Sequence, residues 1–184
     1  MADKLIVDWK EYNTIVEKLA IKVYDSGFKP DLLIGIMRGG APIIDVLSRV
    51  FKLKCAYLAV ESYSGKDIEN QQGELIFSRE LSSTVQNMSG NILLCDDLSD
   101  TGVTLNRSID WLKNYKSLKG KIKQIKTAVL WKKADSTFEP DFCAQRLKDN
   151  PWIVQPFEKY EETLFFRFFA LPTYSNSKST LKNL

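Results

Sequence analysis

The sequence predicts an α/β fold built on a mostly parallel, open sheet that is flanked by helices. Short, almost wholly apolar runs recur along the chain, as expected for strands that are covered on both faces. Segments with helical periodicity lie between these runs, and strands that alternate with helices are typical of parallel sheets. A length of 184 residues and a hydrophobic fraction of 44% suffice for one domain with a sizeable core.

The first helix is predicted over residues 9–23, where apolar side chains recur at helical spacing. Asp8 is placed to cap this helix, and Glu11, three residues later, is its capping-box partner. Gly27 and Pro30 are expected to end the helix before the first strand of the sheet.

The remaining elements are predicted in alternating order. Strands are expected at residues 31–36, 54–60, 91–95 and 124–131, and helices at 41–51 and 102–115. The polar segment 61–89 separates two strands and has strand character of its own at 74–77. A connection this long in a compact domain favours a functional lid. Ligands of open α/β sheets bind beyond the carboxyl ends of the strands, so the loops after residues 36 and 95 are the candidate sites.

The composition argues against several classes of function. Lys and Arg number 26 and Asp and Glu number 23, and a net charge of +3 does not favour nucleic acid or an anionic membrane as the main partner. No apolar run approaches the roughly 18 residues of a membrane helix, no signal peptide is expected, and three widely spaced cysteines suit a reducing compartment. We therefore expect a cytoplasmic protein. Because the sequence contains no histidine, its acid–base chemistry must use Asp, Glu, Lys or Tyr.

The sharpest motif covers residues 92–105 and joins an apolar strand, three aspartates and a turn of small residues that enters a helix. Backbone N–H groups at a helix start form a ready site for phosphate, which the helix dipole also favours. Gly102 permits close backbone approach, and the threonines on either side add hydroxyl donors. The adjacent carboxylates Asp96 and Asp97 suit ribose hydroxyls or a hydrated Mg²⁺. Ordinary helix capping explains any one of these residues, but not the whole set.

A second candidate anion site lies in the loop after residue 36, where Arg38 precedes Gly39 and Gly40. The arginine offers N–H donors, and the glycines let the backbone approach an anion. Taken alone, this loop is better explained as a Gly-Gly turn with a solvated arginine. Beside the first motif, anion binding is favoured.

The strand, the acidic pair and the Asp-Thr-Gly-x-Thr loop together resemble the motif with which type I phosphoribosyltransferases bind 5-phosphoribosyl-1-pyrophosphate (PRPP). The resemblance implies that Asp96 and Asp97 serve the ribose hydroxyls and the associated Mg²⁺. It implies that Asp100 faces the base as a catalytic acid–base residue. The residues expected to bind the 5-phosphate are Thr101, Gly102, Val103 and Thr104.

Two further loops match the same family. The loop at Arg38 and Gly39 is similar to its pyrophosphate loop, which often carries a cis peptide before the glycines, here the bond Met37–Arg38. The pair Ser62 and Tyr63 at the start of the lid is similar to the catalytic-loop pair of the hypoxanthine–guanine branch.

The C-terminal third is similar to the hood that sets base specificity in xanthine–guanine phosphoribosyltransferases. By that resemblance Lys132 meets the 6-oxo group of a purine, while Trp152 and Ile153 flank the base. Glu158 is expected at a second Mg²⁺. Lys133 follows Lys132 on the strand and is expected to point the other way. A solvated lysine pair and a core role for the tryptophan are the alternatives.

We expect one phosphoribosyltransferase domain at residues 1–172, with the lid at 61–89 and a small hood at about 141–172, and a polar tail at 173–184. The resemblance implies transfer of the phosphoribosyl group of PRPP to xanthine, guanine or hypoxanthine in purine salvage. Mg²⁺ is the implied cofactor, a nucleoside monophosphate and pyrophosphate are the products, and a homo-oligomer (dimer or tetramer) is expected.

Two alternatives stay open. A pyrimidine or orotate phosphoribosyltransferase is the nearer one, and Lys132 together with Trp152 argues against it. A PRPP-sensing regulator that keeps the fold and acts on nucleic acid would need a basic face, which the nearly balanced charge does not indicate. The sequence does not decide whether Arg167 touches pyrophosphate.

Overall fold

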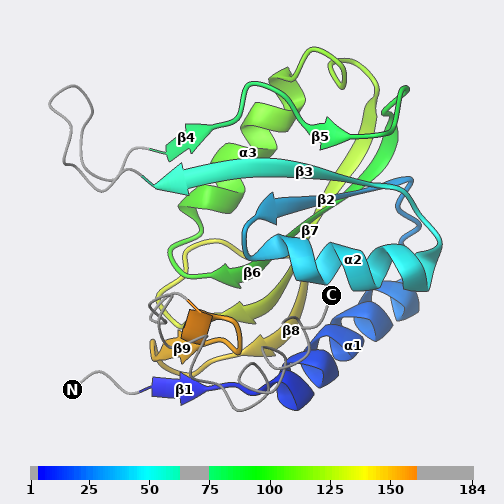
Figure 1. The fold of residues 1–184 in the computed structure, drawn as a ribbon. Helices are drawn as coiled ribbons and strands as arrows, with labels where there is room; N and C mark the ends of the chain where they lie inside the picture. The colour runs from blue at the N-terminus through cyan, green and yellow to red at the C-terminus, as the bar shows by residue number, and fades with distance from the viewer. Residues whose placement is uncertain (1–3, 63–74, 161–184) are drawn as a thin grey trace, which may run out of the picture. The chain divides into compact units, whose positions relative to one another are not determined.

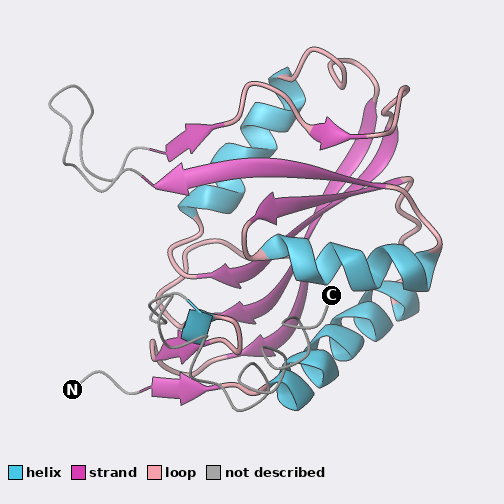
Figure 2. Ribbon diagram, viewed as in Figure 1, coloured by secondary structure: helices cyan, strands magenta, loops and turns pink. Residues whose placement is uncertain are grey.

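The computed structural model describes residues 4–62 and 75–160 (Figures 1 and 2). The contacts within the chain divide it into two compact units. The larger unit comprises residues 13–150, and the smaller combines residues 1–12 with 151–184. Helix α1 (Trp9–Asp25) begins in the smaller unit and ends in the larger one.

The larger unit is built on a sheet with the strand order β4-β3-β2-β6-β7-β8, in which β5 also pairs with β3. Its parallel strands are β2 (Leu32–Met37), β3 (Cys55–Ser62), β6 (Gly90–Ser99), β7 (Ile122–Lys132) and β8 (Phe142–Arg146). The short strands β4 (Leu75–Phe77) and β5 (Ser82–Ser83) run antiparallel to β3. The mostly parallel, open sheet predicted from the sequence is confirmed.

The helices of the larger unit after α1 are α2 (Gly40–Phe51) and α3 (Val103–Asn114). They cover opposite faces of the sheet (Figure 2). Because successive side chains of a strand point to opposite faces, neighbouring residues of β2 contact different helices. Ile34 of β2 lies in a buried cluster with Leu105 of α3. Gly35 faces the other way, and a Cβ there would lie 2.8 Å from Cδ1 of Ile44 in α2. The missing side chain at Gly35 therefore lets α2 pack closely on β2, beside the loop that the sequence marks as an anion site.

The smaller unit contains β1 (Lys4–Ile6), the start of α1, β9 (Trp152–Val154) and the 3₁₀ helix η1 (Glu158–Tyr160). Strands β1 and β9 pair in parallel. Asp8 caps α1 as predicted, because its Oδ1 accepts a hydrogen bond from the backbone N–H of Glu11 at 2.8 Å. The rings of Trp9, Tyr12 and Phe157 pack together with centroids 5.9 to 6.3 Å apart. This aromatic cluster ties the segment after β9 to the start of α1.

Strand β6 is longer than predicted. It runs on to Ser99, so Asp96 and Asp97 lie within the strand and not after it. The sequence does not predict β1, β5, β8 or β9. Strands β1, β5 and β9 have only two or three residues, and β8 ends in the polar residues Gln145 and Arg146, so it is not an apolar run. In the described ranges, no helix is long and apolar enough to cross a membrane.

Candidate active site

The carboxyl ends of the neighbouring parallel strands β2 and β6 bring the two predicted anion loops together. Gly39 lies against Asp97, since a Cβ at Gly39 would overlap the Asp97 carboxylate. A Cβ at Gly40 would overlap the carbonyl oxygen of Cys95. The glycine pair therefore places the loop after β2 directly on the end of β6, next to the acidic pair.

The loop after β2 turns at once into α2. The peptide bond Met37–Arg38 is cis, which confirms the bond predicted there. The side chain of Arg38 is exposed, and its carbonyl oxygen accepts a hydrogen bond from the backbone N–H of Ala41 at 3.1 Å. An anion at this position could accept hydrogen bonds from two kinds of donor, the guanidinium of Arg38 and the backbone N–H groups at the start of α2.

Asp96 and Asp97 differ in their exposure to solvent. Asp96 is 8% exposed, and its Oδ1 accepts a hydrogen bond from the backbone N–H of Asp97 at 3.0 Å. Burial, and after it the charge of Asp97, raises the pKa of Asp96 well above its ordinary value. Asp97 is half-buried and lies against the loop after β2. The pair presents one carboxyl shielded from water and one at the edge of the sheet.

The segment after β6, for which a phosphate-binding role is predicted, leads into α3. Gly102 is the N-cap residue of α3 and has a left-handed backbone with φ 88°. A side chain at Gly102 would be strained by this φ and would overlap Phe138. Thr101 is exposed, and its Oγ1 accepts a hydrogen bond from the backbone N–H of Val103 at 3.4 Å. Thr104 is half-buried in the first turn of α3. Backbone N–H groups, a helix dipole and hydroxyls thus coincide at one helix start.

Residues 133–138, of which the sequence marks only Lys133, form a loop that contacts the segment after β6; we call them the buttress loop. The Oγ atoms of Ser99 and Ser136 lie 2.8 Å apart in a buried hydrogen bond. The Oγ1 of Thr137 donates a hydrogen bond to the carbonyl oxygen of Thr101 at 3.1 Å. The neighbouring hydroxyl residues Ser136 and Thr137, in the loop after β7, were the sequence signal that could have indicated these hydrogen bonds.

Lys132 is the last residue of β7 and pairs in register with Ser99 at the end of β6. Its Nζ lies 3.7 Å from Oε2 of Glu139, and its side chain is 15% exposed. Glu139 also forms an ion pair with Arg146, which holds the pKa of the Glu139 carboxyl below its ordinary value. Lys132 thus lies at the same edge of the sheet as the two anion loops, and an exposed acid holds its ammonium group.

Lys133 is not the inert neighbour that strand alternation predicts. Strand β7 ends at Lys132, so the alternation does not extend to the next residue. Lys133 is 8% exposed, and its Nζ lies 3.2 Å from Oδ1 of Asp100. The side chain of Asp100 is 62% exposed. The two lysines contact different acids, and Lys133 contacts the aspartate that was predicted to be catalytic.

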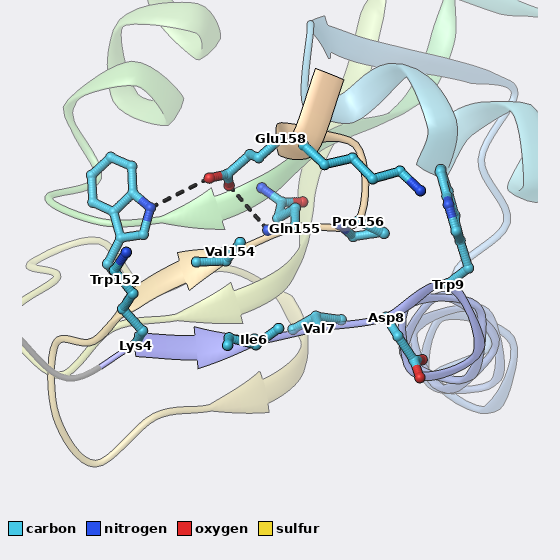
Figure 3. Close-up of a pocket in the computed structure, with 11 residues that line it drawn as sticks. Lys4, Ile6, Val7, Asp8, Trp9, Trp152, Val154, Gln155, Pro156 and Glu158 are labelled. Carbon is cyan, nitrogen blue, oxygen red and sulfur yellow. Dashed lines mark hydrogen bonds between the residues drawn. The ribbon is translucent and has the colours of Figure 1, made fainter. Parts of the chain in front are cut away.

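The predicted hood residues Trp152, Ile153 and Glu158 belong to the smaller unit. Ile153 is buried, whereas Trp152 is exposed and lines a cavity of about 450 Å³ with Trp9, Gln155 and Glu158 (Figure 3). The carboxylate of Glu158 accepts one hydrogen bond from Nε1 of Trp152 at 3.3 Å and one from the backbone N–H of Gln155 at 3.0 Å. Glu158 therefore orients the indole of Trp152 within this unit.

Part of the predicted lid lies outside the described residues. Ser62 ends β3, whereas Tyr63 is outside the described residues, as are Arg167 and the tail at 173–184. The described end of the lid begins with β4, which pairs with β3.

The end of the predicted lid packs on α3. Phe77 stacks on Trp111 with ring centroids 6.3 Å apart, and Trp111 stacks on Tyr115 at 4.7 Å. The hydroxyl of Tyr115 bonds to the carboxylate of Glu80. These contacts join the segment after β4 to the helix that begins at the phosphate loop.

The parallel sheet, with two candidate anion-binding loops joined at one of its edges, defines an α/β protein of a known class. The Phosphoribosyl transferase domain model matches residues 6–162, and the chain belongs to this family. It is a phosphoribosyltransferase. A comparison with curated proteins found no match.

Solved structures share this fold. A purine phosphoribosyltransferase from Pyrococcus horikoshii is 26% identical, with a TM-score of 0.67 over 84% of this chain and 93% of its own. The xanthine-guanine-hypoxanthine phosphoribosyltransferase of Helicobacter pylori is 21% identical, with a TM-score of 0.66 over 96% of this chain and 99% of its own. An orotate phosphoribosyltransferase from Aeropyrum pernix is 16% identical, with a TM-score of 0.57 over 85% and 80%. The last two likenesses concern the fold alone.

Proposed function

We propose that this phosphoribosyltransferase transfers the 5-phosphoribosyl group of PRPP to a 6-oxopurine, namely xanthine, guanine or hypoxanthine. The observation that carries the proposal is the contact between Gly39 and the carboxylate of Asp97, which joins two anion-binding loops at one edge of the sheet. PRPP carries a phosphate and a pyrophosphate on either side of a ribose. This edge offers a loop for each anion and an acidic pair between the loops.

Each end of PRPP has a matching group of donors. Arg38 and the backbone at Gly39 bind the pyrophosphate through charge-assisted and backbone hydrogen bonds. Residues 101–104 bind the 5-phosphate at the start of α3. Asp96 and Asp97 accept hydrogen bonds from the ribose hydroxyls. Because the two loops are joined, binding at one end fixes the position of the other.

We infer that catalysis depends on Mg²⁺. This ion usually binds through one or two carboxylates together with substrate phosphates. Asp96 and Asp97 fit that pattern, and among the described residues no group of three or more Asp, Glu or Cys side chains gathers into a protein cage. When bound, Mg²⁺ would neutralise part of the negative charge on the pyrophosphate. A second ion at Glu158 stays a prediction, and it would replace the hydrogen bonds that this carboxylate accepts.

Asp100 is the acid–base residue of the proposal. The bond between C1 and the pyrophosphate oxygen breaks through an oxocarbenium-like state, and the base nitrogen attacks C1 from the opposite face. Asp100 holds or removes the proton of an imidazole-ring nitrogen. The lid at 61–89 excludes the water that would otherwise hydrolyse PRPP.

The choice of base is assigned to Lys132, Trp152 and Ile153. An ammonium group donates to a 6-oxo oxygen, and an aromatic ring stacks on a planar base. The Pyrococcus horikoshii relative, a purine phosphoribosyltransferase, supports a purine as the acceptor. The position of Lys132 at the same sheet edge as the PRPP loops supports its role in recognising the 6-oxo group.

The proposal is tested by incubating the protein with PRPP, Mg²⁺ and one base at a time, and measuring the nucleotide that forms. The bases are guanine, xanthine, hypoxanthine, adenine, uracil and orotate. We expect the 6-oxopurines to be used far better than adenine. Orotate or adenine as the best acceptor would overturn the 6-oxopurine assignment and leave the PRPP assignment standing. PRPP binding without nucleotide from any base would indicate a PRPP-sensing regulator.

A further inference from the structure

We propose that Thr137 is a positioning residue, which sets the direction of the Gly102 N–H so that this group can donate to the 5-phosphate. The inference rests on the proposed function, because it assumes that residues 101–104 bind that phosphate. The observation that carries it is the hydrogen bond from Oγ1 of Thr137 to the carbonyl oxygen of Thr101 at 3.1 Å. Thr137 belongs to the buttress loop, and the sequence predicts no role for it.

The carbonyl group of Thr101 and the N–H of Gly102 belong to one peptide unit. Its peptide bond is trans, and a planar trans unit holds its C=O and its N–H in opposite directions. Because the carbonyl oxygen accepts the hydrogen bond of Thr137, the N–H of Gly102 points away from the buttress loop. The bond that fixes the carbonyl therefore fixes the direction in which the N–H donates.

Gly102 does not select this orientation by itself. Its φ is 88°, and glycine adopts positive and negative φ about equally readily, so the peptide unit before it can turn over at low cost. Phe138 limits the space around Gly102, since a Cβ on the glycine would overlap the Cβ of Phe138. The neighbouring hydroxyl of Thr137 then bonds to the carbonyl side of the unit. The buttress loop thus supplies both the packing and the hydrogen bond that the glycine lacks.

The buttress loop is itself anchored on two sides. The Oγ atoms of Ser136 and Ser99 form a buried hydrogen bond, which joins the loop to the end of β6. On the other side, the backbone N–H of Asp135 donates to Oδ1 of Asn150 at 3.0 Å. Ser136 directly precedes Thr137 in the chain. The hydroxyl that holds the phosphate-binding segment therefore comes from a backbone that is already fixed.

The hydrogen bond of Thr137 has little part in the stability of the fold. Thr101 and Thr137 are both exposed, so water can replace either partner when the bond is lost. Removal of the hydroxyl should therefore leave the protein folded. Its effect should be seen where the direction of the Gly102 N–H matters, in the affinity for a phosphate group.

The test uses two ligands that each carry one of the anionic groups of PRPP. Ribose 5-phosphate reports on residues 101–104, and pyrophosphate reports on the loop after β2 and serves as the check on the fold. The dissociation constant of each is measured by calorimetry in the presence of Mg²⁺. We expect Thr137→Val to weaken ribose 5-phosphate binding by about three- to tenfold, the usual contribution of one hydrogen bond, and to leave pyrophosphate binding unchanged.

Two variants control for the substitution. Thr137→Ser keeps the hydroxyl and should bind both ligands as the native protein does. Thr84→Val makes the same change at another exposed threonine, in the loop after β5, and should also leave both dissociation constants unchanged. Native affinity for ribose 5-phosphate in Thr137→Val, or an equal loss for both ligands, would overturn the proposal.

The backbone amides of residues 101–104 separate the two levels of inference. In the native protein, saturation with ribose 5-phosphate should move the amide proton of Gly102 downfield in a ¹⁵N–¹H spectrum, and in Thr137→Val the shift should be smaller. If no amide of residues 101–104 shifts, the phosphate assignment of the proposed function is wrong. If other amides in this segment shift while that of Gly102 does not, the positioning role of Thr137 alone is wrong.

Discussion

Gly39 lies so close to Asp97 that a Cβ there would overlap the Asp97 carboxylate, although its backbone (φ −61°, ψ −38°) is open to any residue. A larger residue at this position would therefore have to displace the Asp97 side chain or the loop, and the constraint is one of space and not of conformational freedom. The contact is the physical link between the loop after β2 and the acidic pair of β6.

The first prediction uses this contact. Gly39→Ala should push the pyrophosphate loop away from Asp97 and weaken PRPP binding, measured by calorimetry, by about 10- to 100-fold, since overpacking costs about 1–3 kcal/mol. Asp97→Ala removes the carboxylate that the new methyl group meets. The double variant should therefore bind PRPP no more weakly than Asp97→Ala alone. An unchanged Kd for PRPP in Gly39→Ala would show that the loop or the Asp97 side chain moves aside at no cost in binding free energy.

A second prediction concerns the stability of the protein against pH. The pKa of Asp96 is raised in the folded state by burial and by the charge of Asp97. Below the ordinary value of 3.8 the carboxyl is protonated in both the folded and the unfolded chain, and nothing is lost. As the pH rises above 3.8, the unfolded chain releases this proton and the folded chain retains it, so folding loses stability until the raised pKa is reached.

Asp96→Asn removes this titration and keeps an oxygen that can accept the hydrogen bond from the Asp97 N–H. The variant should therefore have a higher Tm than the native protein at pH 7, by about 2–4 °C for each kcal/mol recovered. The gain should shrink as the pH falls toward 4, which thermal melts at several pH values would record. A gain that does not depend on pH would mean that the burial of the ionised carboxylate is not its cause.

The third prediction is metal dependence. Excess EDTA should abolish nucleotide formation and weaken PRPP binding, because two acids at the sheet edge face an anion that carries several negative charges. Mg²⁺ added beyond the chelator should restore both. EDTA already saturated with Mg²⁺ is the control for effects of the chelator itself. Turnover that persists in excess EDTA would show that the acidic pair acts without a metal.

Local patterns in the sequence were sufficient to predict the sheet and the positions of both candidate anion loops. The apolar run at 31–36 became β2, and the acidic pair with its Asp-Thr-Gly turn lies where a strand meets a helix, as predicted. The cis bond at Met37–Arg38 was predicted from the resemblance of that loop. These features are encoded within a few neighbouring residues, so a single segment carries its own signal.

Contacts between distant segments could not be predicted in this way. Strands β1 and β9 are three residues each and pair across most of the chain, so neither has a readable period. The ion pair of Lys133 with Asp100 depends on where β7 ends, and the boundaries of elements are the least certain feature of a sequence pattern. The support of Gly102 by Phe138 depends on two loops packing together, which no local pattern records.

The last prediction concerns Lys132 and the choice of base. An ammonium group that faces a 6-oxo oxygen gains a charge-assisted hydrogen bond, whereas the 6-amino group of adenine presents another donor. Lys132→Gln offers both a donor and an acceptor, so it should narrow the gap between 6-oxopurines and adenine, chiefly by lowering kcat/KM for the 6-oxopurines. The expected loss is about 10-fold or more, because hydrogen bonds to charged groups contribute about 1.5–3 kcal/mol.

Lys133 cannot serve as the control for this change, since its ammonium contacts Asp100. Lys126→Gln is the better control, because this residue lies on the same strand with its Nζ 5.2 Å from the ring centroid of Phe28. It should leave the base preference intact even where it lowers stability. If Lys133→Gln shifts the base preference while Lys132→Gln does not, the lysine that reads the base is the one beside Asp100. If neither variant shifts it, recognition of the 6-oxo group belongs to another part of the chain.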